Sequence, residues 1–319
     1  TCLHCAAGNG YNDIILLLFR KHASVRRYMK AINRGGETPI HIAAYACRTK
    51  TVELLIGLGT DINITSSKGM TPLHIAIEKG CIDTVKSLLD GGADLNMKDK
   101  DGYTVLHYAT RDNHEEITKL LLDKGADPDV TDKNGVTPLF ACFSRGYINI
   151  AKLFFDYGAS VDVVENEGKT LLHYAVFYNR TDLVKLLIDY TSDMNIDTKD
   201  YAGRTPLHFA AERGHVDSIN ALLDLGANID ATDNRNYTSL HFAAGRGNSE
   251  AVLVLLERGA KTHIINDDKQ IPVQRAIREG HINVVMDLVG NDKRAAMYTA
   301  IVSGQIKIVE MLLDRDIIE

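Results

Sequence analysis

The sequence has little of what several protein classes require. Its net charge of −6 is small for 319 residues, so no general affinity for nucleic acids or anionic membranes is expected. The longest apolar run, Ile14 to Phe19, is too short to cross a bilayer, which argues against direct membrane insertion by this segment. No secretory signal or transit peptide is visible. The five cysteines have no obvious mates, Cys47, Cys81 and Cys142 being widely scattered, and this fits a reducing compartment.

Sequence motifs for enzymatic chemistry are also missing. There is no phosphate-binding loop, nucleophile elbow or zinc-hydrolase helix. Cys2 and Cys5 have the spacing of a redox or half-zinc motif, but no second cysteine pair follows, so we interpret them as helix-core or surface thiols. Carboxylates recur in turn-forming segments, where an Asp side chain bonds its own backbone. These are Asp99, Asp132, Asp200 and Asp233. We therefore predict a non-enzyme, with no catalytic residue, no metal ligand and no cofactor.

A short pattern, Thr-Pro-Leu-His or a close variant, recurs along almost the whole chain. Most successive copies are 33 residues apart, and one step is 35. Thr is a good N-cap residue and Pro suits the first helical position, so each copy predicts a helix start. The copies begin near Thr1, Thr38, Thr71, Thr104, Thr137, Thr170, Thr205, Thr238 and Ile271, with a degenerate copy near Ala295.

Residues 71–103 show what one copy predicts. A first helix starts after Thr71 and ends at Gly80, and a second helix follows from about Asp83. The second helix has an apolar stripe that includes Leu88 and Leu89, and a turn-rich finger closes the unit. One such unit cannot bury its apolar stripe alone, so neighbouring units must stack into one continuous core.

The 33-residue period with Thr-Pro-Leu-His-x-Ala resembles the ankyrin-repeat family over essentially the full length. The resemblance implies an all-α solenoid of stacked helix-turn-helix repeats with short β-hairpin fingers, in a curved, elongated array. We predict that residues 1–319 form a single domain of this kind. The resemblance also implies that the histidine of each copy hydrogen-bonds within and between repeats, near the capping Thr. These histidines are His4, His41, His74, His107, His173, His208 and His241.

The resemblance further implies that partners bind a concave face, made of finger tips and the exposed positions of the first helices. Those positions are the residue before each Thr and the residues seven and eight after it. Aromatic and Arg side chains are the usual anchors at interfaces. At these positions the candidates are Tyr103, Arg111, Arg145, Phe177, Tyr178, Arg204, Arg213, Tyr237 and Arg246. We expect the partner to be a protein or a peptide.

Two functions fit this sequence. The first is a cytoplasmic, non-catalytic adaptor that binds a protein partner on its concave face. The alternative is the array of a large membrane-active protein, such as an ankyrin-bearing ion channel or a secreted, pore-forming latrotoxin, serving assembly and receptor contact. The missing initiator Met and the interior-like first repeat lead us to expect that the chain was cut from a longer one. The identity of the partner and the oligomeric state stay open at this point.

Overall fold

The structure, a computed structural model, describes residues 1–21, 25–191, 194–289 and 293–314. Its regular elements in this part of the chain are all α-helices. The fingers were expected to be β-hairpins, but the β pairing among the described residues is one isolated antiparallel bridge between Thr232 and Thr238. The fingers are therefore turns, because each is too short to extend its pairing into strands.

Each repeat contributes a first helix and a second helix. The first helices are α1 (Cys2–Asn9), α4 (Pro39–Tyr45), α6 (Pro72–Glu78), α8 (Val105–Arg111), α10 (Pro138–Arg145), α12 (Leu171–Phe177), α14 (Pro206–Arg213), α16 (Ser239–Arg246), α18 (Pro272–Glu279) and α20 (Lys293–Val302). The second helices are α2 (Asn12–Lys21), α5 (Thr49–Gly57), α7 (Ile82–Asp90), α9 (Glu115–Asp123), α11 (Ile148–Asp156), α13 (Thr181–Tyr190), α15 (Val216–Asp224), α17 (Ser249–Glu257), α19 (Ile282–Leu288) and α21 (Ile306–Asp314). A short additional helix, α3 (Val25–Met29), lies between the first two repeats.

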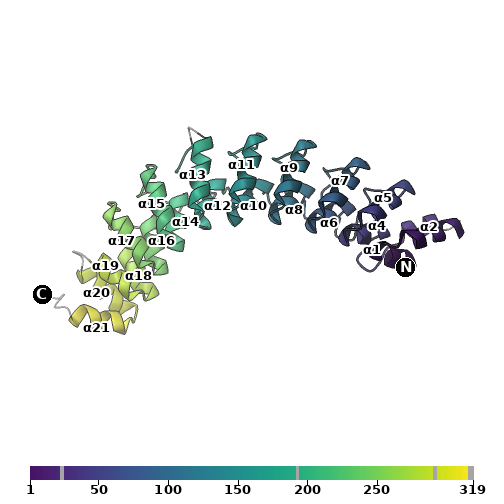
Figure 1. Cartoon of the computed structure of the whole chain (residues 1–319). Helices are drawn as coiled ribbons and strands as arrows, with labels where there is room; N and C mark the ends of the chain where they lie inside the picture. The colour runs from purple at the N-terminus through teal and green to yellow at the C-terminus, as the bar shows by residue number, and fades with distance from the viewer. Residues whose placement is uncertain (22–24, 192–193, 290–292, 315–319) are drawn as a thin grey trace. The chain divides into compact units, whose positions relative to one another are not determined.

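The contacts group the chain into two compact units. Unit 1 comprises residues 1–142 and 147–160, and unit 2 comprises residues 143–146 and 161–319. Within each unit the first helices stack in one row and the second helices in another (Figure 1). The prediction that all 319 residues form one continuous domain stays a prediction.

The helix starts lie where the repeated pattern predicts them. Thr71 has extended backbone angles, with φ −85° and ψ 166°, and its hydroxyl accepts the amide of His74 at 3.4 Å. Pro72 occupies the first helical position, where its missing N–H leaves no bond unmade. At the other end of the helix, Gly80 has a left-handed φ of 69°, which lets the chain reverse into α7.

The finger turns are held by the carboxylates that the sequence singled out. Asp200 Oδ1 accepts the backbone amides of Ala202 at 3.0 Å and Arg204 at 2.8 Å. Asp99, Asp132 and Asp233 accept the amides two and four residues later in the same way. The interpretation of these carboxylates as turn formers is confirmed.

The core stripe of the second helix is narrower than the sequence predicts. In α7, Val85 and Leu88 are completely buried, whereas Leu89 is only half-buried. The prediction that Leu89 belongs to the core stripe was therefore wrong. Leu88 lies on the fully buried side of α7, while Leu89 lies one helical step, about 100°, further round the helix.

The repeated histidines connect each repeat to the next. In one buried example, His208 Nδ1 accepts the backbone amide of Thr205 at 2.9 Å, and its Nε2 donates to the carbonyl of Tyr237 at 3.0 Å. Tyr237 is the residue before the Thr of the following repeat. All seven pattern histidines make the equivalent bond to the following repeat, as the resemblance implied.

These contacts require a neutral imidazole. Because Nδ1 accepts a backbone amide, the single ring proton must be on Nε2, where it is donated to the carbonyl. Burial lowers the pKa of His74, His173 and His241 to about 4, since a charged ring loses its hydration. Burial also lowers the pKa of His41, His107 and His208.

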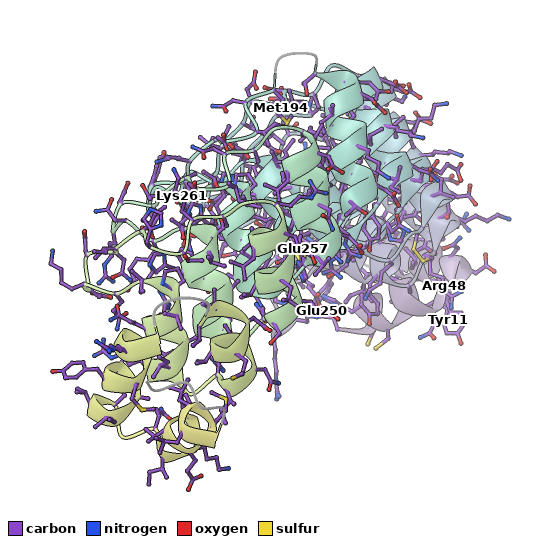
Figure 2. The ribbon with its side chains drawn as sticks, turned by 90° about the vertical axis from the view of Figure 1, so that its left-hand side faces the viewer. Tyr11, Arg48, Met194, Glu250, Glu257 and Lys261 are labelled. Carbon is purple, nitrogen blue, oxygen red and sulfur yellow. A yellow bond between two sulfur atoms is a disulfide. The ribbon has the colours of Figure 1, made fainter. Side chains whose placement is uncertain are left out.

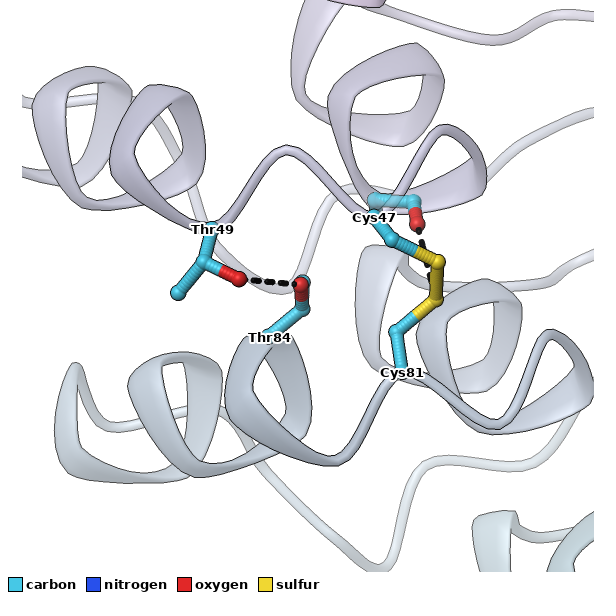
Figure 3. Close-up of a disulfide and its surroundings, with 5 residues drawn as sticks. Cys47, Thr49, Cys81 and Thr84 are labelled. Atoms are coloured by element: carbon cyan, nitrogen blue, oxygen red, sulfur yellow. Dashed lines mark hydrogen bonds between the residues drawn. A yellow bond between two sulfur atoms is a disulfide. The ribbon is translucent and has the colours of Figure 1, made fainter.

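A second connection runs backward, from the start of several second helices to the first helix of the previous repeat. His215 Nδ1 donates to the carbonyl of Val176 at 3.0 Å, and Asn248 donates to the carbonyl of Ala211 at 2.9 Å. Cys81 occupies the same slot of its repeat, and here the connection is covalent. Its sulfur forms a disulfide with Cys47 of the previous repeat, with a Cα–Cα distance of 5.5 Å (Figure 3).

The disulfide corrects the expectation that Cys47 and Cys81 have no mates. Cys47 follows α4 with a left-handed φ of 53°, in the slot that other repeats fill with Gly or Asn. That conformation is unfavourable for most side chains. A non-glycine residue there, 34 positions before another Cys, is the sequence signal that was available. Cys2 and Cys5 are exposed free thiols, and Cys142 is a buried one.

The buried histidines make the stability of the folded chain depend on pH. As pH falls below about 6.5, the unfolded chain takes up protons that the folded rings exclude, so stability is lost progressively toward pH 4. Each excluded proton contributes a slope of up to about 1.4 kcal/mol per pH unit. We predict that His241→Gln flattens the pH dependence of urea unfolding between pH 7 and pH 4.5, roughly by one proton.

Gln is a suitable replacement because Gln274 fills this slot in its own repeat and accepts the amide of Ile271 at 3.0 Å. Replacement of the exposed His263 by Gln is the control and should leave the slope unchanged. An unchanged slope in the His241 variant would contradict the assignment.

The corrected core stripe gives a second prediction. Leu88→Ala should lose about 2–5 kcal/mol of stability, because it leaves a cavity in a fully packed site. Leu89→Ala should lose clearly less, since part of that side chain already contacts water. Urea unfolding of the two variants provides the measurement. Equal losses would show that the stripe is broader than the structure indicates.

Candidate partner-binding face

The candidate face in unit 2 lies at the C-terminal ends of the first helices. Phe177 is the last residue of α12 and Tyr178 is its C-cap, while Arg213 and Arg246 are the last residues of α14 and α16. Arg145 holds the same place at the end of α10 and is exposed. The repeat period brings these side chains to equivalent places because each follows its capping Thr by seven or eight residues.

A small pocket lies on this face. It has a volume of about 150 Å³ and is lined by Lys169, His173, Tyr174, Phe177, Tyr178 and Phe209. Two of these, Phe177 and Tyr178, were predicted as anchors. Tyr178 is 43% exposed and its ring centroid lies 4.9 Å from that of Phe177, so the pair forms an accessible wall.

Two arginines stack on the aromatic rings of this region. The Arg213 guanidinium carbon lies 4.0 Å from the centroid of Phe177, and that of Arg204 lies 4.3 Å from the centroid of Phe209. Stacking of this kind attracts a cation to the face of a ring and holds the long side chain in one orientation. Arg204, Phe177 and Arg213 are therefore brought together by the fold, as members of one cluster.

The cations of the cluster differ in how they are neutralised. Arg204 binds the buried carboxylate of Asp200 at 2.9 Å and Arg246 binds Glu212, with 3.2 Å from its Nε. Arg213 is exposed and makes no ion pair among the described residues. Arg213 is thus the cation of this cluster that remains available to an anionic group.

In unit 1 the corresponding residues contact one another and their neighbours through ring packing and ion pairs. Tyr103 is half-buried, and its ring packs edge-on against His107 at 5.4 Å and Tyr108 at 6.2 Å. Arg111 lies over the Tyr108 ring at 4.6 Å and pairs with Asp112 at 2.7 Å. The Tyr108 hydroxyl donates to Asp99 at 2.7 Å, and burial together with this bond raises its pKa.

Tyr237 differs from the prediction of an exposed anchor. It is only 7% exposed, with its ring against His241 and Phe242, and its hydroxyl donates to Asp268. Burial, followed by the bond to Asp268, raises its pKa. The guanidinium of Arg275 covers the ring at 4.5 Å. The finger residue before the Thr therefore turns inward when its neighbours offer an aromatic surface.

The sequence reasoning missed a further row of residues. These directly follow the pattern histidine, or the Gln that replaces it, and include Tyr108, Tyr174, Phe209, Phe242 and Arg275. In the structure Tyr108, Phe209 and Phe242 pack against the histidine of the preceding repeat. Arg275 covers the finger ring of Tyr237, and the Tyr174 ring lies 6.3 Å from that of Tyr178 in its own repeat. Their recurrence at one slot was the signal that could have found them. The prediction that all nine anchor candidates share one concave surface involves both units and stays a prediction.

The described residues lack the features of a metal site and of a membrane span. Among the described residues, no group of three or more His, Cys, Asp or Glu side chains has a geometry that could hold a metal ion. None of the helices in the same part of the chain combines the length and the apolar character that a bilayer crossing requires.

Comparison with known proteins places the repeats in a family. The family profile described as "Ankyrin repeats (3 copies)" matches residues 1–66, 40–132, 124–200, 192–266 and 240–318. Among curated proteins, the chain is similar to Delta-latroinsectotoxin-Lt1a of Latrodectus tredecimguttatus, with 38% identity over 68 residues. The matched segment is 21% of this chain and 5% of the toxin, so the likeness concerns a small part of that protein. Because the profile matches cover nearly every residue, the chain belongs to the ankyrin-repeat family.

Proposed function

We propose that this chain is a non-catalytic scaffold that binds a protein or peptide partner through the ends of its first helices. The observation that carries the proposal is the accessible aromatic wall of Phe177 and Tyr178, which opens onto the pocket in unit 2. Ankyrin repeats generally mediate protein–protein interaction, and a rigid stack of helices suits such a role because it presents side chains at fixed intervals.

The repeat architecture does not require aromatic residues at these two positions. The equivalent pair is Glu78 and Lys79 in one repeat and Gly245 and Arg246 in another. Both of those repeats keep the Thr–His capping box, and their first helices end at the same position of the pattern as α12 or one residue later. A large apolar wall at a position that tolerates Gly or Glu therefore favours a role in recognition.

The double substitution of Phe177 and Tyr178 by Ala tests this proposal. Peptides selected by the wild-type chain from a random phage-displayed library should bind the variant at least about tenfold more weakly, because aromatic anchors dominate interface energetics. The thermal midpoint should change little, since both side chains are partly exposed. Fluorescence anisotropy with the synthetic peptides measures the affinity.

Leu253→Ala is the matched control, because Leu253 is 43% exposed on the second helix α17 of the same unit. Its affinity for the selected peptides should equal that of the wild type. Equal binding by the double variant, or a fall in its stability without a change in binding, would show that the two aromatics serve stacking and that partners bind elsewhere.

A second function is favoured by a specific observation, the disulfide between Cys47 and Cys81. Disulfides persist in oxidising environments and are rare in the cytosol, so this bond favours an extracellular parent over the cytoplasmic location expected from the cysteine count. The partial likeness to a latroinsectotoxin points the same way. In this version, the chain is part of the array of a larger secreted, membrane-active protein, and its face contributes to assembly or receptor contact.

The state of the two cysteines separates these locations. Native protein from its source, alkylated without reduction and digested, should yield a peptide pair linked through Cys47 and Cys81 if the parent is secreted. Cys2 and Cys5 should be alkylated in the same sample, as exposed free thiols. Alkylation of Cys47 and Cys81 to the same extent as Cys2 would support the cytoplasmic adaptor.

A further inference from the structure

We propose that the pocket face of unit 2 selects an acidic peptide segment that carries one aromatic or large aliphatic anchor. The anchor fills the pocket beside Phe177 and Tyr178, and a flanking carboxylate meets Arg213. This inference rests on the proposed function and names the chemistry of its partner.

The size of the pocket suits a single side chain. A cavity of about 150 Å³ can hold one benzene ring, and this pocket has a volume of about 150 Å³. Five of its six lining residues are aromatic, counting His173, so the walls favour an apolar ring or a branched aliphatic group.

A cationic anchor is disfavoured despite the aromatic walls. Aromatic pockets bind ammonium groups through the open faces of their rings. Here Arg213 already covers Phe177 and Arg204 already covers Phe209. Lys169 lines the same pocket but is paired with Glu167, and Arg204 is paired with Asp200, so the repulsion that an incoming ammonium would meet comes from Arg213. The occupant is therefore neutral at its anchor.

Charge differs between the two rows of helices in unit 2. The last turns of the first helices carry Arg145, Arg213, Arg246 and Arg278, although Arg246 is paired with Glu212 and the exposed Glu279 ends α18. The second helices expose mainly carboxylates, namely Asp182, Asp189, Asp217, Asp224, Glu250 and Glu257. Glu250 and Glu257 both lie on α17 (Figure 2).

The arginines on this face determine the sign of the charge that the partner should carry. Arginine near a helix C-terminus also interacts favourably with the helix dipole, which accounts for part of this pattern. The dipole does not account for the ring stacking that holds Arg213 on the aromatic wall. In a chain whose net charge is −6, this basic row is the part of unit 2 that attracts an anionic segment.

Peptide selection followed by charge reversal tests the inference. Random phage-displayed peptides are selected on the wild-type chain, and the strongest are synthesised and measured at low and high salt. The selected peptides should be rich in Asp and Glu around one Phe, Leu, Ile or Met, and should bind more weakly at high salt. Arg213→Glu should weaken their binding by about tenfold or more.

Lys185→Glu is the matched control, because Lys185 is exposed on the second helix α13 of the same unit. It should change the affinity by less than about twofold. Arg213→Gln should give an intermediate loss, and the thermal midpoints of all variants verify that each one folds.

The outcomes distinguish this inference from the proposed function. The selected peptides could depend on Phe177 and Tyr178 but be neutral or basic, or could bind Arg213→Glu with unchanged affinity. Either result would contradict an acidic partner but would still support the scaffold function. Failure to select any peptide that depends on Phe177 and Tyr178 overturns both.

Discussion

The bond from a neutral histidine to the backbone of the following repeat is the constraint on which the structure depends. Each ring accepts an amide at its own helix cap and donates to the carbonyl of the next finger, as His208 does between Thr205 and Tyr237. The bond sets the place of the finger relative to the helix before it. The imidazole stays uncharged because burial lowers its pKa.

Residues that hold the repeats together are distinct from residues that are free to vary, and a partner is expected to bind the latter. The capping Thr, the histidine and the finger carboxylates make structural bonds in most repeats, so few residue types can replace them. The ends of the first helices make none of these repeated bonds, and the residue in one slot there varies in size from glycine, at Gly245, to phenylalanine, at Phe177. In unit 2 this freedom produces an aromatic wall with an unpaired arginine on it, whereas Arg111 of unit 1 is neutralised by its neighbours.

The disulfide shows how a repeat can replace one connection by a stronger one. Residues at the start of the second helices, such as His215, hydrogen-bond to the previous repeat. At Cys81 the same slot is joined covalently to Cys47, close to a hydrogen bond between the hydroxyls of Thr49 and Thr84 at 2.9 Å (Figure 3). Such a bond restricts the unfolded chain, and it favours an oxidising environment.

The sequence by itself determined the repeats, the helix starts, the finger turns and the role of the histidines, because these follow from local bonding preferences repeated at a constant period. Only the tertiary structure decided that Leu88 rather than Leu89 fills the core, that Tyr237 turns inward beneath Arg275, and that Cys47 meets Cys81. Each of these depends on the side chains that a neighbouring repeat presents at that point. Local propensity does not encode such pairings, since the partners lie some 30 residues or more apart in the chain and meet only when the helices stack.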